Sequence, residues 1–151
     1  MKITIIFLVI NFAALGIGGY LMGEGPSSNW YNNLNQAPWT PPGWVFGFAW
    51  TTIMICFSLF MSYWYQATPQ KNILLSLFVV QLILNISWNP IFFHLHQTLF
   101  GLIVISALTV VIGLMLQNSC STIKMKALLI LPYFLWLLVA TSLNGYIYFK
   151  N

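Results

Sequence analysis

Charged residues are so sparse in this chain that they divide it into long uncharged stretches. Lys2 and Glu24 enclose 21 uncharged residues, Glu24 and Lys71 enclose another 46, and Lys126 and Lys150 enclose 23. Only 4% of the 151 residues are charged and 60% are hydrophobic, whereas a soluble domain carries about 25% charged residues. Most of this surface must therefore contact membrane lipid, and the net charge of +4 does not indicate a nucleic-acid partner.

The lengths of the uncharged stretches predict membrane-spanning helices. A helix needs about 20 residues to cross ~30 Å of hydrocarbon, and the stretches lack the alternation of a transmembrane barrel. The first stretch is longer than the apolar core of a secretory signal and has no clear cleavage site. We therefore expect it to be retained in the mature protein. The predicted fold is an all-α integral membrane protein, one domain (1–151) forming a bundle of five transmembrane helices at about 3–22, 42–65, 72–94, 98–117 and 125–148.

The lysines predict the orientation of this bundle. With five spans, the amino terminus and the loops 66–71 and 118–126 share one side, which carries four of the five lysines. The positive-inside rule places that side in the cytoplasm. The carboxyl terminus and the segment 23–41 then lie on the opposite side.

The segment 23–41 is too long for a simple connection between helices, and loops of this length tend to be functional or disordered. It contains Tyr31 and Trp39, whereas disordered segments are poor in aromatic residues. We therefore expect a partly ordered lid. Residues 29–36 are expected to form a short helical turn, with Asn29 as a possible cap.

Tryptophans crowd the start of the second span. Pro42 marks the start of the helix, because proline is tolerated in a first turn. Trp30, Trp39 and Trp44 fit an aromatic belt at the membrane interface and a lid equally well. Trp50 lies about 12 Å further along the helix axis, and a belt does not explain its position.

Three predicted helices present faces that carry large aromatic rings, and on two of these faces amide side chains occur as well. Residues at i, i+4 spacing share one helix face. Buried asparagines that only join helices contribute about 0.6 kcal/mol each, and this interpretation is favoured for any single asparagine. Three such faces together predict a mostly apolar cavity with a few polar groups, which is typical of a small-molecule site. The faces carry Pro42, Phe46, Trp50 and Met54; Gln81, Asn85, Trp88, Asn89 and Phe92; and Tyr133, Trp136, Ala140 and Asn144.

Prolines and small residues add to this interpretation. Pro90 and Pro132, predicted inside the third and fifth helices, each remove an internal hydrogen bond and are expected to kink or locally open the helix. In the first span, Ala14-x-x-x-Gly18 and the similar Gly19-x-x-x-Gly23 permit close helix approach. We expect them to pack within the bundle.

The polar residues exclude most kinds of catalysis. Glu24 is the only carboxylate side chain, so there is no acid pair, and no activated serine or phosphate-binding loop is present. General acid–base hydrolysis and proton coupling through intramembrane carboxylates are excluded. His94 and His96 point apart and lack a third ligand, so we expect no metal site. The two cysteines lack the spacing of a disulfide or zinc site.

Three ordered motifs occur between residues 23 and 148: "GEG…NWYNNL…W-x-PPGWVFGFAW", "LNISWNPIFFHLHQ" and "LPYFLWLLVATSLNGYIY". They resemble the tryptophan-rich sensory protein / translocator protein family, also known as the peripheral benzodiazepine receptor family. The resemblance implies a five-helix membrane protein, often a homodimer, that binds porphyrins, haem and isoquinoline or benzodiazepine-type ligands. Animal members also bind cholesterol. It implies no required cofactor.

The resemblance also implies which residues form the ligand site. Under it, the segment 23–41 covers a cavity that opens between the helices. The residues that match cavity-wall positions are Tyr31, Pro41, Phe46, Trp50, Met54, Asn85, Trp88, Asn89, Trp136 and Ala140. Trp39 of the lid and Asn144 of the third polar face complete the predicted site.

The chain departs from the family pattern in two places. Before the W-x-P-P motif the family usually reads Leu-x-Lys-Pro, whereas residues 34–37 read Leu-Asn-Gln-Ala. The missing lysine is a cation that would meet a porphyrin propionate. The sterol motif of animal members is a tyrosine closely followed by arginine, and Leu143, Tyr146 or Tyr148, and Lys150 fit only its loose form.

Four functions remain open at this point. A receptor or sensor for porphyrin-type tetrapyrroles is favoured, because the polar faces and the resemblance indicate the same cavity. A transporter of tetrapyrroles or other lipophiles is the first alternative, although the chain lacks the repeats of secondary transporters. Light-dependent porphyrin degradation by Trp50 and Trp136 is the only catalysis that the resemblance implies. The last is a structural protein whose amides only join helices.

Overall fold

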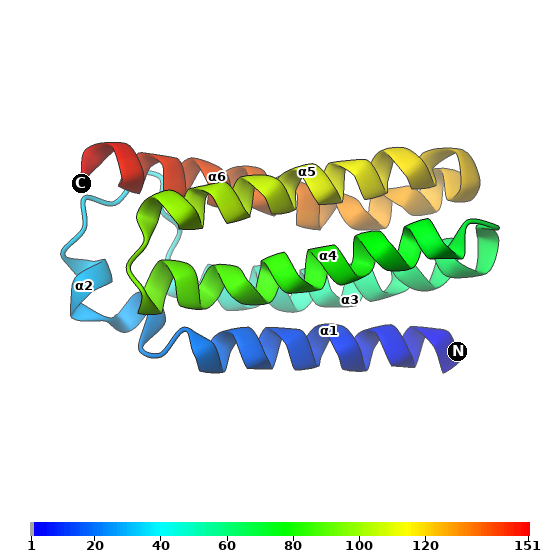
Figure 1. The fold of residues 1–151 in the computed structure, drawn as a ribbon, viewed down its shortest axis with the longest axis horizontal. Helices are drawn as coiled ribbons and strands as arrows, with labels where there is room; N and C mark the ends of the chain where they lie inside the picture. Colours follow the sequence, from blue (N-terminus) through cyan, green and yellow to red (C-terminus); the bar gives the residue numbers. More distant parts are fainter. Residues whose placement is uncertain (1) are drawn as a thin grey trace.

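The computed structural model describes residues 2–151, and this part of the chain is helical without strands (Figure 1). Five long helices account for most of it: α1 (Lys2–Leu21), α3 (Gly43–Ala67), α4 (Lys71–Asn89), α5 (Thr98–Ile123) and α6 (Leu131–Lys150). Four short elements lie between them: η1 (Gly25–Ser27), α2 (Asn29–Asn32), the π-helical turn η2 (Pro90–His94) and the 3₁₀ segment η3 (Lys124–Ile130).

Four continuous helical stretches within residues 2–151 are long and apolar enough to cross a membrane. The last of them, Thr98–Lys150, contains both α5 and α6. These two helices lie side by side, because the chain reverses through η3 (Figure 1). Lys124 has a φ of 48°, which is incompatible with continued α-helix. The prediction of five long apolar helices is confirmed.

Two predicted helix boundaries are wrong. α5 continues to Ile123 instead of ending at 117. The polar residues at its end form hydrogen bonds within the same helix, as when Asn118 Nδ2 donates to the Leu114 carbonyl at 2.7 Å. The fifth span does not begin as an α-helix at 125, since η3 precedes α6, which begins at Leu131. Polarity alone therefore does not locate the end of a helix at the membrane surface.

The two prolines behave differently. Pro90 begins η2, where the Leu95 N–H donates to the Pro90 carbonyl at 2.8 Å, five residues back. The predicted local opening of this helix is confirmed. The predicted kink at Pro132 is wrong, because Pro132 lies in the first turn of α6. An N–H at that position has no intrahelical partner, so proline costs nothing there.

The two ends of the molecule carry different groups. The amino terminus, the α3–α4 connection and η3 lie at one end, whereas α2 and the carboxyl terminus lie at the other (Figure 1). We name these the lysine end, which carries Lys2, Lys71, Lys124 and Lys126, and the loop end. Aromatic contacts between helices fill the core toward the lysine end, with ring centroids 5.1 Å apart for Phe7 and Phe78 and 5.2 Å apart for Phe57 and Tyr133.

Gln81 is an unusual residue in this core. Its side chain is 0% exposed, and neither the amide nitrogen Nε2 nor the amide oxygen Oε1 has a hydrogen-bond partner within residues 2–151. A buried polar group without a partner costs about 1–3 kcal/mol. We therefore expect Gln81→Leu to raise the free energy of unfolding by a similar amount, measured by thermal unfolding in detergent. Gln66→Leu is the control, because Gln66 is exposed and donates to Ser62. A lower midpoint for Gln81→Leu would contradict the prediction.

Candidate ligand-binding site

A cavity of about 420 Å³ lies in the loop-end half of the molecule, between α1, α3, α4 and α6. Small-molecule sites typically enclose about 300–1,000 Å³ with mostly apolar walls and a few polar groups. This cavity has that composition. Nine of the twelve predicted site residues line it: Tyr31, Phe46, Trp50, Asn85, Trp88, Asn89, Trp136, Ala140 and Asn144.

Aromatic rings in the cavity wall are held by one another. Phe46 meets Trp136 edge to face with ring centroids 5.4 Å apart, and this contact joins α3 to α6. Trp50 meets the buried ring of Tyr133 in the same way at 5.8 Å. Such pairs contribute about 0.5–1.5 kcal/mol beyond burial. The indoles are therefore positioned by the protein itself, before any ligand is present.

Two of the three asparagines in the wall bond within the protein. Asn144 accepts from Trp88 Nε1 at 3.3 Å, across α4 and α6, and donates to the Ala140 carbonyl at 2.9 Å. Asn89 Nδ2 donates to the Asn85 carbonyl at 3.3 Å. Only the bond between Trp88 and Asn144 joins two helices, as the helix-joining interpretation predicts; the other two lie within α6 and within α4.

Asn85 is different. The residue is 7% exposed and lines the cavity, but no group within residues 2–151 forms a hydrogen bond with its side-chain amide; only its backbone carbonyl accepts one. A buried amide without a partner is costly. Its donor and acceptor are therefore available to a group inside the cavity.

Three predicted site residues do not line the cavity. Met54 is 1% exposed and belongs to the core. Trp39 is 54% exposed; its Nε1 donates to Ser142 Oγ at 3.1 Å, and its ring meets Tyr146 edge to face. Pro41 is half-buried in the connection that leads into α3. Helical spacing correctly places Met54 on the face of Trp50, but it does not show how far along that face the cavity extends.

The contribution of α1 to the cavity was not predicted. Ala14 and Gly19 line it, together with Met22. The small residues of α1 were a usable signal, because they mark where another element comes close. A Cβ at Gly18 would lie 2.7 Å from Asn89 Nδ2 of α4, so this glycine packs within the chain, as predicted.

The segment 23–41 starts with a sharp turn at the loop end. Gly23 and Gly25 have φ values of 63° and 53°, a region that glycine adopts without strain. Ser28, and not Asn29 as predicted, caps α2, because Ser28 Oγ accepts from the Tyr31 N–H at 3.2 Å. The cap therefore precedes the predicted position by one residue.

Tyr31 brings the segment 23–41 onto the cavity. Its ring packs against Phe92 and Phe93 of η2 with centroids 6.3 and 5.4 Å away, and burial raises the pKa of its phenol, so the hydroxyl stays neutral. Further along, the Asn35 N–H donates to Asn151 Oδ1 at 2.8 Å. The segment is thus held at η2 and at the carboxyl terminus.

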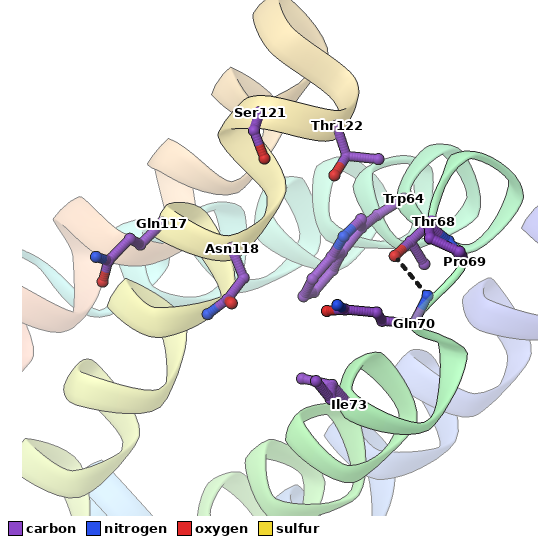
Figure 2. A pocket seen from close by; sticks show the side chains of 9 residues that line it. All are labelled: Trp64, Thr68, Pro69, Gln70, Ile73, Gln117, Asn118, Ser121 and Thr122. Atoms are coloured by element: carbon purple, nitrogen blue, oxygen red, sulfur yellow. Dashed lines mark hydrogen bonds between the residues drawn. The ribbon is translucent and has the colours of Figure 1, made fainter.

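A second hollow, of about 510 Å³, lies at the lysine end between the α3–α4 connection and the end of α5 (Figure 2). Its lining is mainly polar, and within it Thr68 Oγ1 accepts from the Gln70 N–H at 3.1 Å. It contains none of the predicted site residues, and its exposed amides and hydroxyls are open to water. The smaller, ring-walled cavity is therefore the better candidate. The second hollow is lined by Trp64, Thr68, Pro69, Gln70, Ile73, Gln117, Asn118, Ser121 and Thr122.

Charged and metal-binding groups lie away from the cavity. Within residues 2–151 no charged side chain lines it, and no cluster of three or more potential metal ligands occurs. His96 stacks on Trp30 with centroids 4.2 Å apart. The described wall of the cavity is therefore uncharged.

The geometry agrees with the comparison to known proteins. A model of the TspO/MBR family matches residues 6–149. The chain belongs to the TspO/MBR family. The resemblance inferred from the three motifs is confirmed, and TspO/MBR membership agrees with the four apolar helical stretches of a membrane protein.

Similar TspO/MBR proteins occur in distant organisms. Tryptophan-rich protein TspO of Archaeoglobus fulgidus is 32% identical over 145 residues, covering 95% of this chain and 94% of the relative. The translocator protein of Homo sapiens is 31% identical over 140 residues, covering 87% and 79%. The tryptophan-rich sensory protein of Cereibacter sphaeroides is 30% identical over 115 residues, covering 76% and 72%.

Proposed function

We propose that this TspO/MBR protein is a membrane receptor or sensor that binds a flat aromatic ligand in the ring-walled cavity. The ligand class is a porphyrin-type tetrapyrrole, or a drug-like aromatic molecule of similar shape. The observation that carries the proposal is a cavity whose rings are already positioned and whose Asn85 amide has no partner within residues 2–151. The name of the sensory relative supports the same interpretation.

The wall supplies two kinds of binding energy to such a ligand. Contacts with the rings of Trp50, Trp136 and Phe46 provide about 0.5–1.5 kcal/mol each beyond the burial of apolar area. Asn85 adds a donor and an acceptor inside an apolar space, where each polar group selects for a complementary partner. Shape and one polar contact together provide the selectivity.

The charge of the site limits how a porphyrin binds. No cation lines the cavity within residues 2–151, and a carboxylate buried without a partner is costly. We propose that the ring enters the cavity and that its propionates stay outside, in contact with water or lipid headgroups. Neutral aromatic ligands meet no such constraint.

Two alternative activities would use the same cavity. The name of the human relative supports transport, which predicts ligand flux across liposomes in addition to binding. Light-dependent porphyrin degradation is favoured by one observation, that both Trp50 and Trp136 line the cavity. Loss of porphyrin absorbance only under illumination would identify it.

We propose that the lysine end faces the cytoplasm, because four of the five lysines lie there and the positive-inside rule counts such residues. The segment 23–41 then covers the cavity from the opposite side. A homodimer and a sterol site at the carboxyl end stay predictions from the family resemblance.

Titration of the purified protein with protoporphyrin, followed by tryptophan fluorescence, tests the proposed function. We expect saturable quenching. Replacing Trp50 and Trp136 together by phenylalanine is expected to weaken binding about tenfold, which corresponds to about 1.4 kcal/mol. Trp44→Phe is the control, because Trp44 is 73% exposed and lies outside the cavity. Absence of saturable quenching, or unchanged binding by the double variant, would contradict the proposal.

A further inference from the structure

The seam between α1 and α3 is closed in the lysine-end half of the molecule. The hydroxyls of Thr4 and Ser62 share a hydrogen bond of 2.8 Å. Closer to the middle of the two helices, Asn11 Nδ2 of α1 donates to Ser58 Oγ of α3, also at 2.8 Å. Interhelical hydrogen bonds of this kind are among the forces that hold membrane helices together.

The same seam is open in the loop-end half. Thr51, Gly47 and Gly43 continue the face of α3 that carries Ser58, at helical spacing. Gly19 lies on the facing side of α1. A Cβ at any of these three glycines would have no atom of residues 2–151 within 4 Å, apart from its own helix and chain neighbours. We name the space bordered by Gly19, Gly43, Gly47 and Thr51 the lateral opening.

The lateral opening leads into the cavity. All four of its residues line the cavity, and the three on α3 are also exposed on the surface. At this level α1 packs closely on α4, because a Cβ at Gly18 would lie 2.7 Å from Asn89 Nδ2. The two helices that bond to each other near the lysine end therefore leave a gap where the cavity begins.

The surroundings of the opening indicate what passes through it. The residues that follow its glycines in the sequence are exposed and aromatic: Tyr20 is 86% exposed, Trp44 73% and Phe48 67%. Exposed aromatic side chains of this kind suit lipid and the membrane interface. On the inside, the unpartnered and nearly buried amide of Asn85 faces the cavity. The glycines thus connect an apolar exterior with a built binding site.

We propose that an apolar ring ligand dissolved in the bilayer passes into and out of the cavity through the lateral opening, without displacement of the segment 23–41. This inference rests on the proposed function. It also accounts for the modest cavity volume, because a large ring can extend part of its edge through the opening.

Filling the opening tests the proposal. Gly47→Leu places a side chain in the gap, and Gly16→Leu is the matched control, because Gly16 also has open space around its Cβ but does not line the cavity. Protein in liposomes is mixed rapidly with vesicles that contain protoporphyrin, and quenching of tryptophan fluorescence is followed in time. We expect association and dissociation both to slow, by about tenfold or more. Because Gly47 also lines the cavity, its Kd is measured separately by equilibrium titration, and the dissociation rate distinguishes the two effects: a narrowed cavity alone would speed dissociation, whereas a closed opening slows it. Gly16→Leu is expected to match the wild type.

A second arm tests passage past the segment 23–41. Asn35 and Asn151, which are hydrogen bonded, are replaced by cysteine in a background without Cys56 and Cys120, and a short thiol-reactive cross-linker ties them. The proposal predicts unchanged rates. Slower exchange in the cross-linked protein, or unchanged rates in Gly47→Leu with intact binding, would overturn the lateral opening alone. Absence of saturable quenching in the wild type would overturn the proposed function, and the opening with it.

Discussion

Replacing Ala140 by phenylalanine is expected to lower the affinity for protoporphyrin by about 100-fold, which corresponds to about 2.7 kcal/mol. Ala140 lines the cavity on α6 and is 9% exposed. A phenyl ring there would occupy cavity space that the ligand needs, in a wall that also contains Trp136 and Trp88. The affinity is measured by the same fluorescence titration.

The control for this substitution lies on the same helix. Leu138 is 47% exposed and does not line the cavity, so Leu138→Phe adds a ring to α6 without narrowing the site. Its affinity is expected to equal that of the wild type. If Ala140→Phe folds with an unchanged unfolding midpoint and still binds normally, the ligand does not occupy this cavity.

The sequence predicted the number and approximate limits of the long helices because lipid imposes a simple rule. A span must be uncharged over about 20 residues, so Lys2, Glu24 and Lys71 mark spans even without any contact information. Boundaries at the membrane surface are less constrained. Asn118 is polar but stays helical by bonding within its own helix, and the reversal before α6 depends on the positive φ of Lys124.

Much of the cavity wall was also predictable, since rings and amides at i, i+4 spacing mark a helix face. The depth of the cavity was not, because Met54 shares the face of Trp50 and yet belongs to the core. The open side was missed for a different reason. Glycines at helical spacing permit close helix packing, but spacing does not tell a packed glycine such as Gly18 from an open one such as Gly19 or Gly47.

Replacing Gly18 by leucine is expected to destabilise the protein by about 1–3 kcal/mol, the usual cost of overpacking. A Cβ at Gly18 would lie 2.7 Å from Asn89 Nδ2, closer than such contacts allow. To make room, the Asn89 amide would have to move and give up the hydrogen bond that the same nitrogen donates to the Asn85 carbonyl at 3.3 Å. The midpoint of thermal unfolding in detergent, followed by circular dichroism, measures the effect.

Gly16→Leu is again the matched control for Gly18→Leu. Gly16 lies two residues away on α1, and a Cβ there would have no neighbour within 4 Å in residues 2–151 outside its own helix and chain neighbours. Glycine costs up to about 1 kcal/mol within a helix, so Gly16→Leu is expected to leave the midpoint unchanged or raise it. Equal midpoints for the two variants would contradict the close contact between α1 and α4. If Gly18→Leu then changed only the oligomeric state, this glycine face would instead pack between protomers.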